Sequence, residues 1–186
     1  MHYPRVSLYA LMLAAAGIPL YIHLPQFASV NLGISLSAIG VVLSAIRMVD
    51  PVQDPLIGWA IDRWPRAQLG FAVLAALALA VGFPALFSLQ AGPHVVAQLV
   101  AILVLLFSAY SLGSILLYGR SATLALRPEP EALMTLAGFR EGGMLAGVIV
   151  AAIAPAVLVA MGAGGQGYPA FGWFLGAVAV IAAVVT

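Results

Sequence analysis

Six long apolar stretches, separated by short polar or turn-forming segments, dominate the chain. A helix needs about 20 consecutive apolar residues to cross the hydrocarbon core of a bilayer. The stretches at 6–27, 37–61, 68–89, 95–119, 133–161 and 168–186 meet this requirement. Turn-forming residues mark the connections, for example Asn31-Leu32-Gly33 and Gly92-Pro93. The pattern predicts an all-α polytopic membrane protein with six transmembrane helices in one bundle over residues 1–186.

The two ends of the chain raise separate questions. The first apolar stretch follows Arg5 as a signal peptide would, but Pro19 and Pro25 interrupt it and no small-residue cleavage pattern follows. A first spanning helix that is retained is therefore the favoured interpretation. The last stretch stays apolar up to Thr186 without a charged flank. We therefore expect a fragment of a longer protein.

Composition places the chain in the bilayer and excludes several functions. The sequence is 64% hydrophobic and 7% charged, which is typical of a membrane protein. The net charge of +1 argues against a nucleic acid partner, and the lack of cysteine excludes disulfides and thiolate metal sites. The three histidines are scattered, and no protease or hydrolase motif is present. We expect neither an enzyme nor a bound cofactor.

The arginines predict the orientation in the membrane. Five of them fall at the N-terminus, in the second loop or in the fourth loop, namely Arg5, Arg63, Arg66, Arg120 and Arg127. The first, third and fifth loops contain none. Cytoplasmic loops are enriched in arginine and lysine, so the N-terminus and the end of the sixth helix are predicted to be cytoplasmic.

Two aspartates lie inside the second apolar stretch, where ionised groups are costly and usually functional. Asp50 and Asp54 are four residues apart, so their Cβ atoms would be about 5–6 Å apart on a helix. Such a pair can share a proton, pair with an arginine, or hold a small hard cation. Pro51 and Pro55 each remove an N–H and so free a backbone carbonyl as a further ligand. The alternative is an Arg47–Asp50 ion pair that only fixes helix packing.

The same stretch has two expected faces if it forms one regular helix. One stripe collects its charged and small residues, namely Gly40, Ser44, Arg47, Asp50, Asp54 and Gly58. The opposite face is apolar, with Val42, Ile46, Val49, Leu56 and Ala60, and only Gln53 interrupts it. We expect the charged stripe to line a cavity and the apolar face to contact lipid.

The fourth and fifth stretches carry further candidates for a solute path. Arg140 shares a face with Gly143, Gly147 and Ala151, whose small size permits close helix contact. Arg140 would then point inward at a depth similar to that of Asp54, or else lie at the membrane edge and extend toward water. The fourth stretch has hydroxyl and aromatic groups on one face, namely Tyr110, Ser111, Ser114, Tyr118 and Ser121. These suit either a polyhydroxylated solute or hydrogen bonds between helices.

The loop after the second stretch resembles a known motif. The segment from Gly58 to Arg66, read as GWAIDRWPR, resembles the GxxxDRxGR loop of the major facilitator superfamily, with Pro65 in place of a glycine. The resemblance implies that Gly58, Asp62, Arg63 and Arg66 form part of a cytoplasmic gate.

The longer string RMVDPVQDPLIG from Arg47 to Gly58 resembles the second-helix signature of the glycoside–pentoside–hexuronide:cation symporters in that superfamily. PLYIHLP in the first stretch and TLAGFRE around Arg140 resemble the same family. The resemblance implies that Asp50 and Asp54 serve a coupling cation, Na⁺ or H⁺. It also implies twelve helices in two halves, of which this chain is the N-terminal one. A familiar member of the family has sugar-binding aspartates on its first and fourth helices, but here the first stretch has no acid before its end and Ser114 occupies the matching region of the fourth.

We therefore expect a secondary symporter of a bacterial inner membrane that carries a sugar, a glycoside or a related polar solute. Arg47, Arg140, Tyr110, Ser114 and Tyr118 would line the solute path. The expected partners are the lipid bilayer, the solute and a missing second six-helix half. The alternatives are a lipid or drug transporter of the same fold, and a membrane subunit or sensor that transports nothing.

Overall fold

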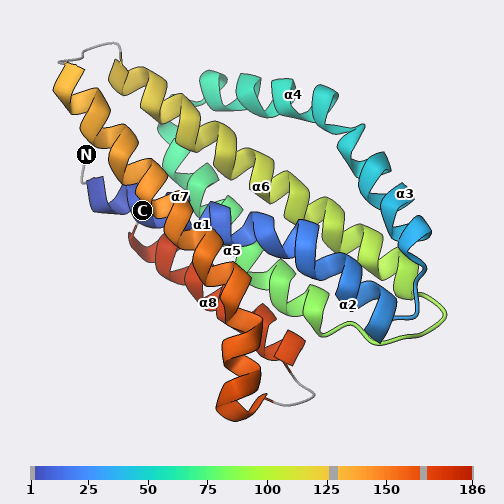
Figure 1. Cartoon of the computed structure of the whole chain (residues 1–186). Helices are drawn as coiled ribbons and strands as arrows, with labels where there is room; N and C mark the ends of the chain where they lie inside the picture. The colour runs from blue at the N-terminus through green and yellow to red at the C-terminus, as the bar shows by residue number, and fades with distance from the viewer. Residues whose placement is uncertain (1–2, 126–129, 164–166, 186) are drawn as a thin grey trace.

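The computed structural model describes residues 3–125, 130–163 and 167–185, and for residues 120–125 and 163 only the backbone. Within these ranges every regular element is a helix, so the predicted all-α class is confirmed. Five helical segments are long and apolar enough to cross a membrane, and a bent pair of helices supplies a sixth. Figure 1 shows α1, α6 and α7 lying together as long rods, with α3 and α4 along one side of the bundle.

The first span contains a break in its middle. It consists of α1 (Tyr3–Ile18), the π-helical segment η1 (Pro19–His23) and α2 (Leu24–Asn31). The backbone N–H of Leu24 donates to the carbonyl of Pro19, the wider i to i+5 spacing of a π-helix. Pro19 and Pro25 flank the segment and remove two donors from the regular ladder, which accounts for a break at this point.

The second span is two helices, which corrects the predicted continuous helix at 37–61. α3 (Leu36–Arg47) and α4 (Asp50–Arg63) are bent by 40° at Met48 and Val49. Pro51 lies in the first turn of α4 and has no N–H for the carbonyl of Arg47, so the helix cannot continue unbroken. At the other end, the Ser35 hydroxyl accepts the N–H of Ala38 and caps α3.

The remaining spans are regular over most of their length. The short 3₁₀ turn η2 (Pro65–Ala67) leads into α5 (Gln68–Phe87), and α6 follows at Val95–Ala125. Next come α7 (Pro130–Leu158), the π-helical segment η3 (Val159–Ala163) and α8 (Gly167–Val185). Arg127 and Thr186 lie outside the described residues, as do residues 126–129 and 164–166 of the last two predicted connections. Of Arg120 and Ser121 only the backbone is described.

Glycines let two pairs of helices approach closely. A Cβ at Gly143 or Gly147 of α7 would collide with the carbonyl oxygens of Ser7 and Leu11 on α1. α5 and α8 meet in the same way, since a Cβ at Gly176 would lie 2.8 Å from the carbonyl oxygen of Ala80. Small residues commonly drive helix association in membranes, because lipid leaves little hydrophobic force between helices. The predicted small-residue face of the fifth span is therefore a packing face against α1.

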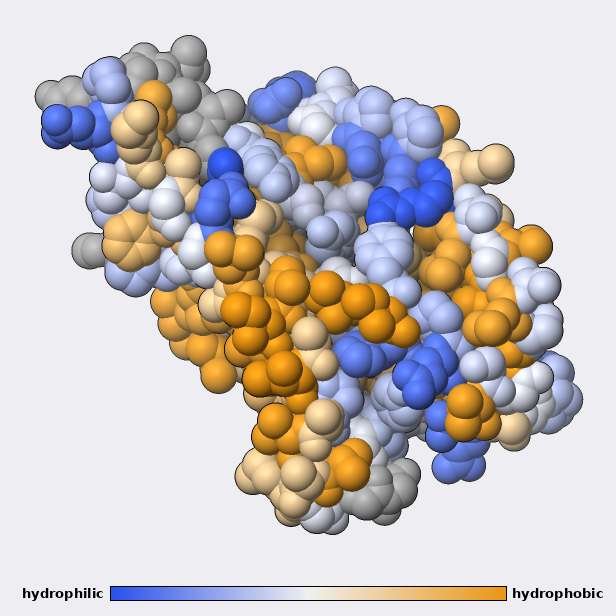
Figure 2. Space-filling view, in the orientation of Figure 1, coloured by the Kyte–Doolittle hydropathy of each residue, from blue (hydrophilic) through white to orange (hydrophobic). Residues whose placement is uncertain are grey.

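The bent second span is held far more loosely than these pairs. Ile61 is the one buried residue of α4, whereas Phe83, Phe87 and Phe171 are almost fully buried between α5 and α8. Figure 2 shows hydrophilic side chains near α4 and toward the N-terminal end of α7, while hydrophobic side chains cover most of the rest of α7.

Candidate functional site

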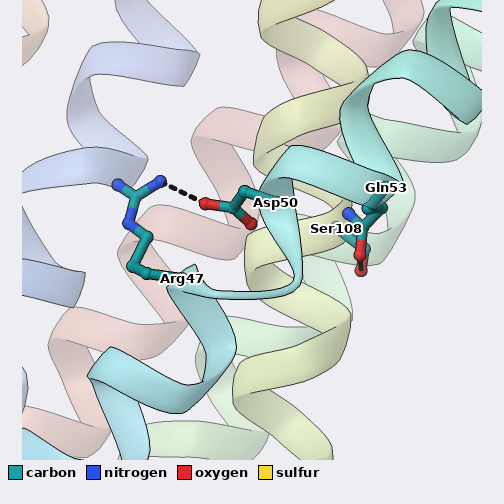
Figure 3. Close-up of polar contacts among 4 residues, drawn as sticks. All are labelled: Arg47, Asp50, Gln53 and Ser108. Atoms are coloured by element: carbon teal, nitrogen blue, oxygen red, sulfur yellow. Dashed lines mark hydrogen bonds and ion pairs between the residues drawn. The ribbon is translucent and has the colours of Figure 1, made fainter.

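The break between α3 and α4 places Arg47 and Asp50 in direct contact. Arg47 is the last residue of α3 and Asp50 the first of α4, and Nη1 of the arginine donates to Oδ2 of the aspartate at 2.7 Å (Figure 3). The side chain of Asp50 is 15% exposed and that of Arg47 is 46% exposed. The Arg47–Asp50 ion pair, one of the alternatives that the sequence left open, is therefore present in the structure.

Arg47 also joins the second span to two others. Its guanidinium carbon lies 5.1 Å from the ring centre of Tyr21 in η1 and 5.2 Å from that of Phe107 in α6. The two rings meet edge to face at 5.9 Å. Cation–π contacts of this kind stabilise a guanidinium without neutralising it. The ion pair is thus held where the first, second and fourth spans meet.

Asp54 is in a different environment from Asp50. Its Oδ1 atom is buried and has no hydrogen-bond partner among the described residues. The two ion pairs of the described residues are Arg47–Asp50 and Arg140–Glu141, so Asp54 is in neither. A buried carboxylate oxygen without a donor is energetically costly inside a membrane. Of the two aspartates, Asp54 is thus the one without an ion-pair partner among the described residues.

Gln53 connects α4 to α6 and corrects the expected lipid face. Its Oε1 accepts a hydrogen bond from the Ser108 hydroxyl at 3.2 Å, and its buried Nε2 has no partner among the described residues. In Figure 3 Asp50 points back to Arg47, while Gln53 points to Ser108 on α6. Ile46 is buried as well. The prediction that this face contacts lipid is therefore wrong for Val42 and Ile46, which pack toward α6, whereas Val49 is 52% exposed.

A cavity of about 340 Å³ lies between the second span and α6. Its walls are mainly the apolar side chains of Val41, Val42, Val49, Val100 and Val104. Asp50, Gln53 and Ser108 supply its polar atoms. An apolar cavity of this size with a few polar groups is typical of a binding site for a small molecule.

Arg140 does not reach the second span. Its Nε and Nη2 atoms donate to Oε1 of Glu141, at 3.0 and 2.8 Å, and its guanidinium lies 5.1 Å from the ring centre of Tyr118. The suggested Asp54–Arg140 contact is therefore absent among the described residues. The side chain of Arg140 is 20% exposed, so it lies mostly covered between α7 and α6. The structure thus brings Arg140 and Tyr118 together, apart from the aspartates.

The other expected path residues are on α6. Tyr110 packs against Gly17 of α1, its hydroxyl oxygen 3.6 Å from the position of a glycine Cβ. Ser114 is half-buried, Ser111 is buried and Tyr118 is 50% exposed. These groups do not form one uninterrupted polar wall.

The expected gate residues lie at the end of α4 and in the following turn. Asp62 and Arg63 end α4, Arg66 is in η2, and all three are exposed. A Cβ at Gly58 would have open space around it. Neither of the two ion pairs of the described residues includes Asp62, Arg63 or Arg66.

The fold and the site define a multi-pass membrane protein that holds ionisable groups inside a bent spanning segment, as membrane transporters do. The chain belongs to the family described as MFS/sugar transport protein, whose family model matches residues 6–186. It is thus a transporter of the major facilitator superfamily. No curated protein and no solved structure matches the chain.

Three contacting residues were not expected from the sequence. Tyr21 and Phe107 hold Arg47, and Ser108 holds Gln53. Gln53 was visible as the one polar residue on an apolar face, which is a usable signal. Aromatic and serine residues are too common in membrane helices to stand out without knowledge of which helices touch.

Proposed function

We propose that the chain is the N-terminal six-helix half of a cation-coupled symporter for a sugar, a glycoside or a related polar solute. It would be of the glycoside–pentoside–hexuronide:cation type, in a bacterial inner membrane with a cytoplasmic N-terminus. The observation that carries the proposal is the buried Oδ1 of Asp54, which has no donor among the described residues. Such an oxygen is stabilised by a proton or a cation, and a transporter can couple that binding to movement.

The two aspartates take different parts in this proposal. Asp54 accepts the proton or Na⁺, while Asp50 is held by Arg47 until the ion arrives. Positive charge near Asp54 repels the guanidinium group of Arg47 and so weakens the Arg47–Asp50 ion pair. Arg47 also contacts Tyr21 and Phe107, so its release alters contacts with the first and fourth spans. Ion binding is thereby coupled to helix positions.

The solute path lies on the face that carries Arg47, Arg140, Tyr110, Ser114 and Tyr118. Arginine guanidinium groups and hydroxyls supply the hydrogen bonds that a polyhydroxylated solute needs. A second six-helix half would complete this path. At the cytoplasmic end, Gly58, Asp62, Arg63 and Arg66 are proposed to meet that half as a gate.

The test is gradient-driven uptake by the full-length protein in lipid vesicles. The solutes are melibiose, a nitrophenyl glycoside and glucuronate, each with and without an imposed Na⁺ or pH gradient. Uptake of at least one solute should require the gradient, and Asp54→Asn should abolish that requirement or the uptake itself. Glu131→Gln is the matched control, because Glu131 is an exposed acid at the start of α7. Uptake that needs no gradient in the unmodified protein, or gradient-dependent uptake that is unchanged in Asp54→Asn, would refute cation coupling through Asp54.

One observation favours a second candidate, a transporter of amphipathic molecules with the same fold. The cavity between the second span and α6 is lined mostly by apolar side chains, which suit an apolar tail better than a sugar ring. Uptake of a fluorescent short-chain lipid, measured by quenching from one side of the vesicle, separates the two candidates. Val104→Asn should reduce lipid movement and leave sugar uptake unchanged if the cavity holds an apolar tail.

A further inference from the structure

The fifth span contains a carbonyl that its own helix cannot satisfy. Pro155 lies inside α7 and has no N–H, so the carbonyl of Ala151, four residues earlier, loses its usual partner. Ala151 is fully buried against the rest of the bundle. Water cannot serve a buried carbonyl within the membrane, so another group has to supply the donor.

His23 of the first span supplies that donor. Its Nε2 atom lies 3.2 Å from the carbonyl oxygen of Ala151. A carbonyl oxygen only accepts, so Nε2 must carry the hydrogen and Nδ1 is left as the acceptor of the neutral ring. The ring of Phe171 in α8 meets the imidazole edge to face at 5.2 Å and limits its rotation. The contact therefore joins the first, fifth and sixth spans.

The segment that presents His23 also contacts the ion pair. His23 ends η1, and Tyr21, two residues earlier in η1, stacks against Arg47. Residues two positions apart in a helix lie on nearly opposite sides of it. The π-helical segment of the first span thus touches the second span through Tyr21 and the carbonyl of Ala151 in the fifth span through His23.

We propose that His23 is a positioning residue that ties the π-helical segment of the first span to the carbonyl left unpaired by Pro155 in the fifth, by donating to the carbonyl of Ala151. Because Tyr21 anchors the same segment against Arg47, displacement of the ion pair moves η1, and His23 transmits that movement to α7. The hydrogen bond itself does not depend on the proposed symport, but its use in transport rests on that function.

A spectroscopic measurement tests the hydrogen bond without any change in the fold. The full-length protein is labelled with ¹⁵N-histidine in lipid, and the His23 signals are assigned as those lost in His23→Gln. At a pH where the ring is neutral, Nε2 should carry the hydrogen. A neutral ring with the hydrogen on Nδ1 would overturn the proposal, whatever the behaviour of the variants.

A double-mutant cycle tests why the bond is needed. His23→Phe keeps the ring against Phe171 but removes the donor, and should lower the midpoint of thermal unfolding by about 2–4 °C. His23→Gln keeps a donor, so its unfolding midpoint should fall by less than half as much. Pro155→Ala returns an N–H to the carbonyl of Ala151. In that background, His23→Phe should lower the unfolding midpoint by less than half as much as it does when Pro155 is present. Equal losses from His23→Phe in both backgrounds would overturn the proposal.

Transport kinetics then separate positioning from simple support of the fold. His23→Phe should lower the maximal uptake rate several-fold at an unchanged half-saturating solute concentration, and His23→Gln should restore most of the rate. An unchanged maximal rate in His23→Phe would overturn the positioning role. If the unmodified protein moves none of the solutes while the cycle shows coupling, the proposed function fails and the hydrogen bond stands.

Discussion

The glycine-packed helix pairs, α1 with α7 and α5 with α8, contact their neighbours in a different way from the bent second span. α7 meets α1 and α8 meets α5 through glycines whose Cα atoms approach a neighbouring backbone. α3 and α4 have open space at Gly40 and Gly58, and contact their neighbours instead through an ion pair, aromatic rings and one amide. The first arrangement is rigid and apolar, and the second is polar and loosely covered.

The difference indicates which part of the protein is scaffold and which part responds to ligands. Backbone-to-backbone contact leaves no room for rearrangement, since any displacement opens a void or creates a collision. Polar contacts between side chains can be exchanged for contacts to an ion or a solute at much lower cost. Both aspartates of the membrane region lie on the loosely covered α4, whereas the glycine-packed α7 carries the Arg140–Glu141 ion pair.

The largest expected effect comes from filling a packed glycine. Gly147→Leu would drive a side chain into the backbone of α1 around Leu11, and should destabilise the protein by about 3 kcal/mol or prevent folding. The measurement is the fraction of monodisperse protein after extraction, together with the unfolding midpoint. Gly142→Leu is the matched control on the same helix, because a Cβ there meets open space. Equal behaviour of the two variants would contradict the packing role assigned to α7.

A smaller effect is expected from the ion pair at the bend. Removing either partner with Arg47→Gln or Asp50→Asn should destabilise the protein, and the two changes should be coupled by about 1 kcal/mol. The coupling is modest because the arginine side chain is nearly half exposed. The measurement is a double-mutant cycle of unfolding free energies in mixed detergent micelles. Additive single effects would show that the pair contributes nothing to the bend.

The smallest effect is expected from the contact between α4 and α6. Ser108→Ala removes the hydroxyl that Gln53 accepts from, and should cost about 0.6 kcal/mol, an average value for hydrogen bonds between membrane helices. Unfolding in the same micelles measures the loss. Ser44→Ala is the control, because Ser44 is exposed on α3. A loss of stability in the control as large as that in Ser108→Ala would show that the Ser108–Gln53 hydrogen bond does not stabilise the protein.

The sequence predicts the helical class and the spans well because each span needs a long apolar run, whatever it packs against. It also predicts that the Gly143 face permits close contact, since small residues at helical spacing have few other uses. The bend at Pro51 was missed, although the proline was recognised as freeing a carbonyl. Treating 37–61 as one regular helix then placed Val42 and Ile46 against lipid, where the structure places them toward α6.

The partners of the polar residues could not be predicted, because they depend on how helices are rotated against one another. Arg47 was a candidate partner for Asp50, and Arg140 on the fifth span was a candidate for Asp54; among the described residues the structure forms only the first of these pairs. The carbonyl freed by Pro155 can be identified from the sequence, but its donor His23 lies 128 residues away. Local rules thus identify groups that need a partner, and tertiary packing decides which partner they find.

The central claim is that Asp54, and not the paired Asp50, takes up the coupling ion. Infrared difference spectroscopy of the full-length protein in lipid tests this directly, with exchange between low and high Na⁺ and between acidic and alkaline pH. A carboxyl or carboxylate band should change in one of the two exchanges, vanish in Asp54→Asn and persist in Glu131→Gln. An ion-dependent band that is unchanged in Asp54→Asn would contradict the claim.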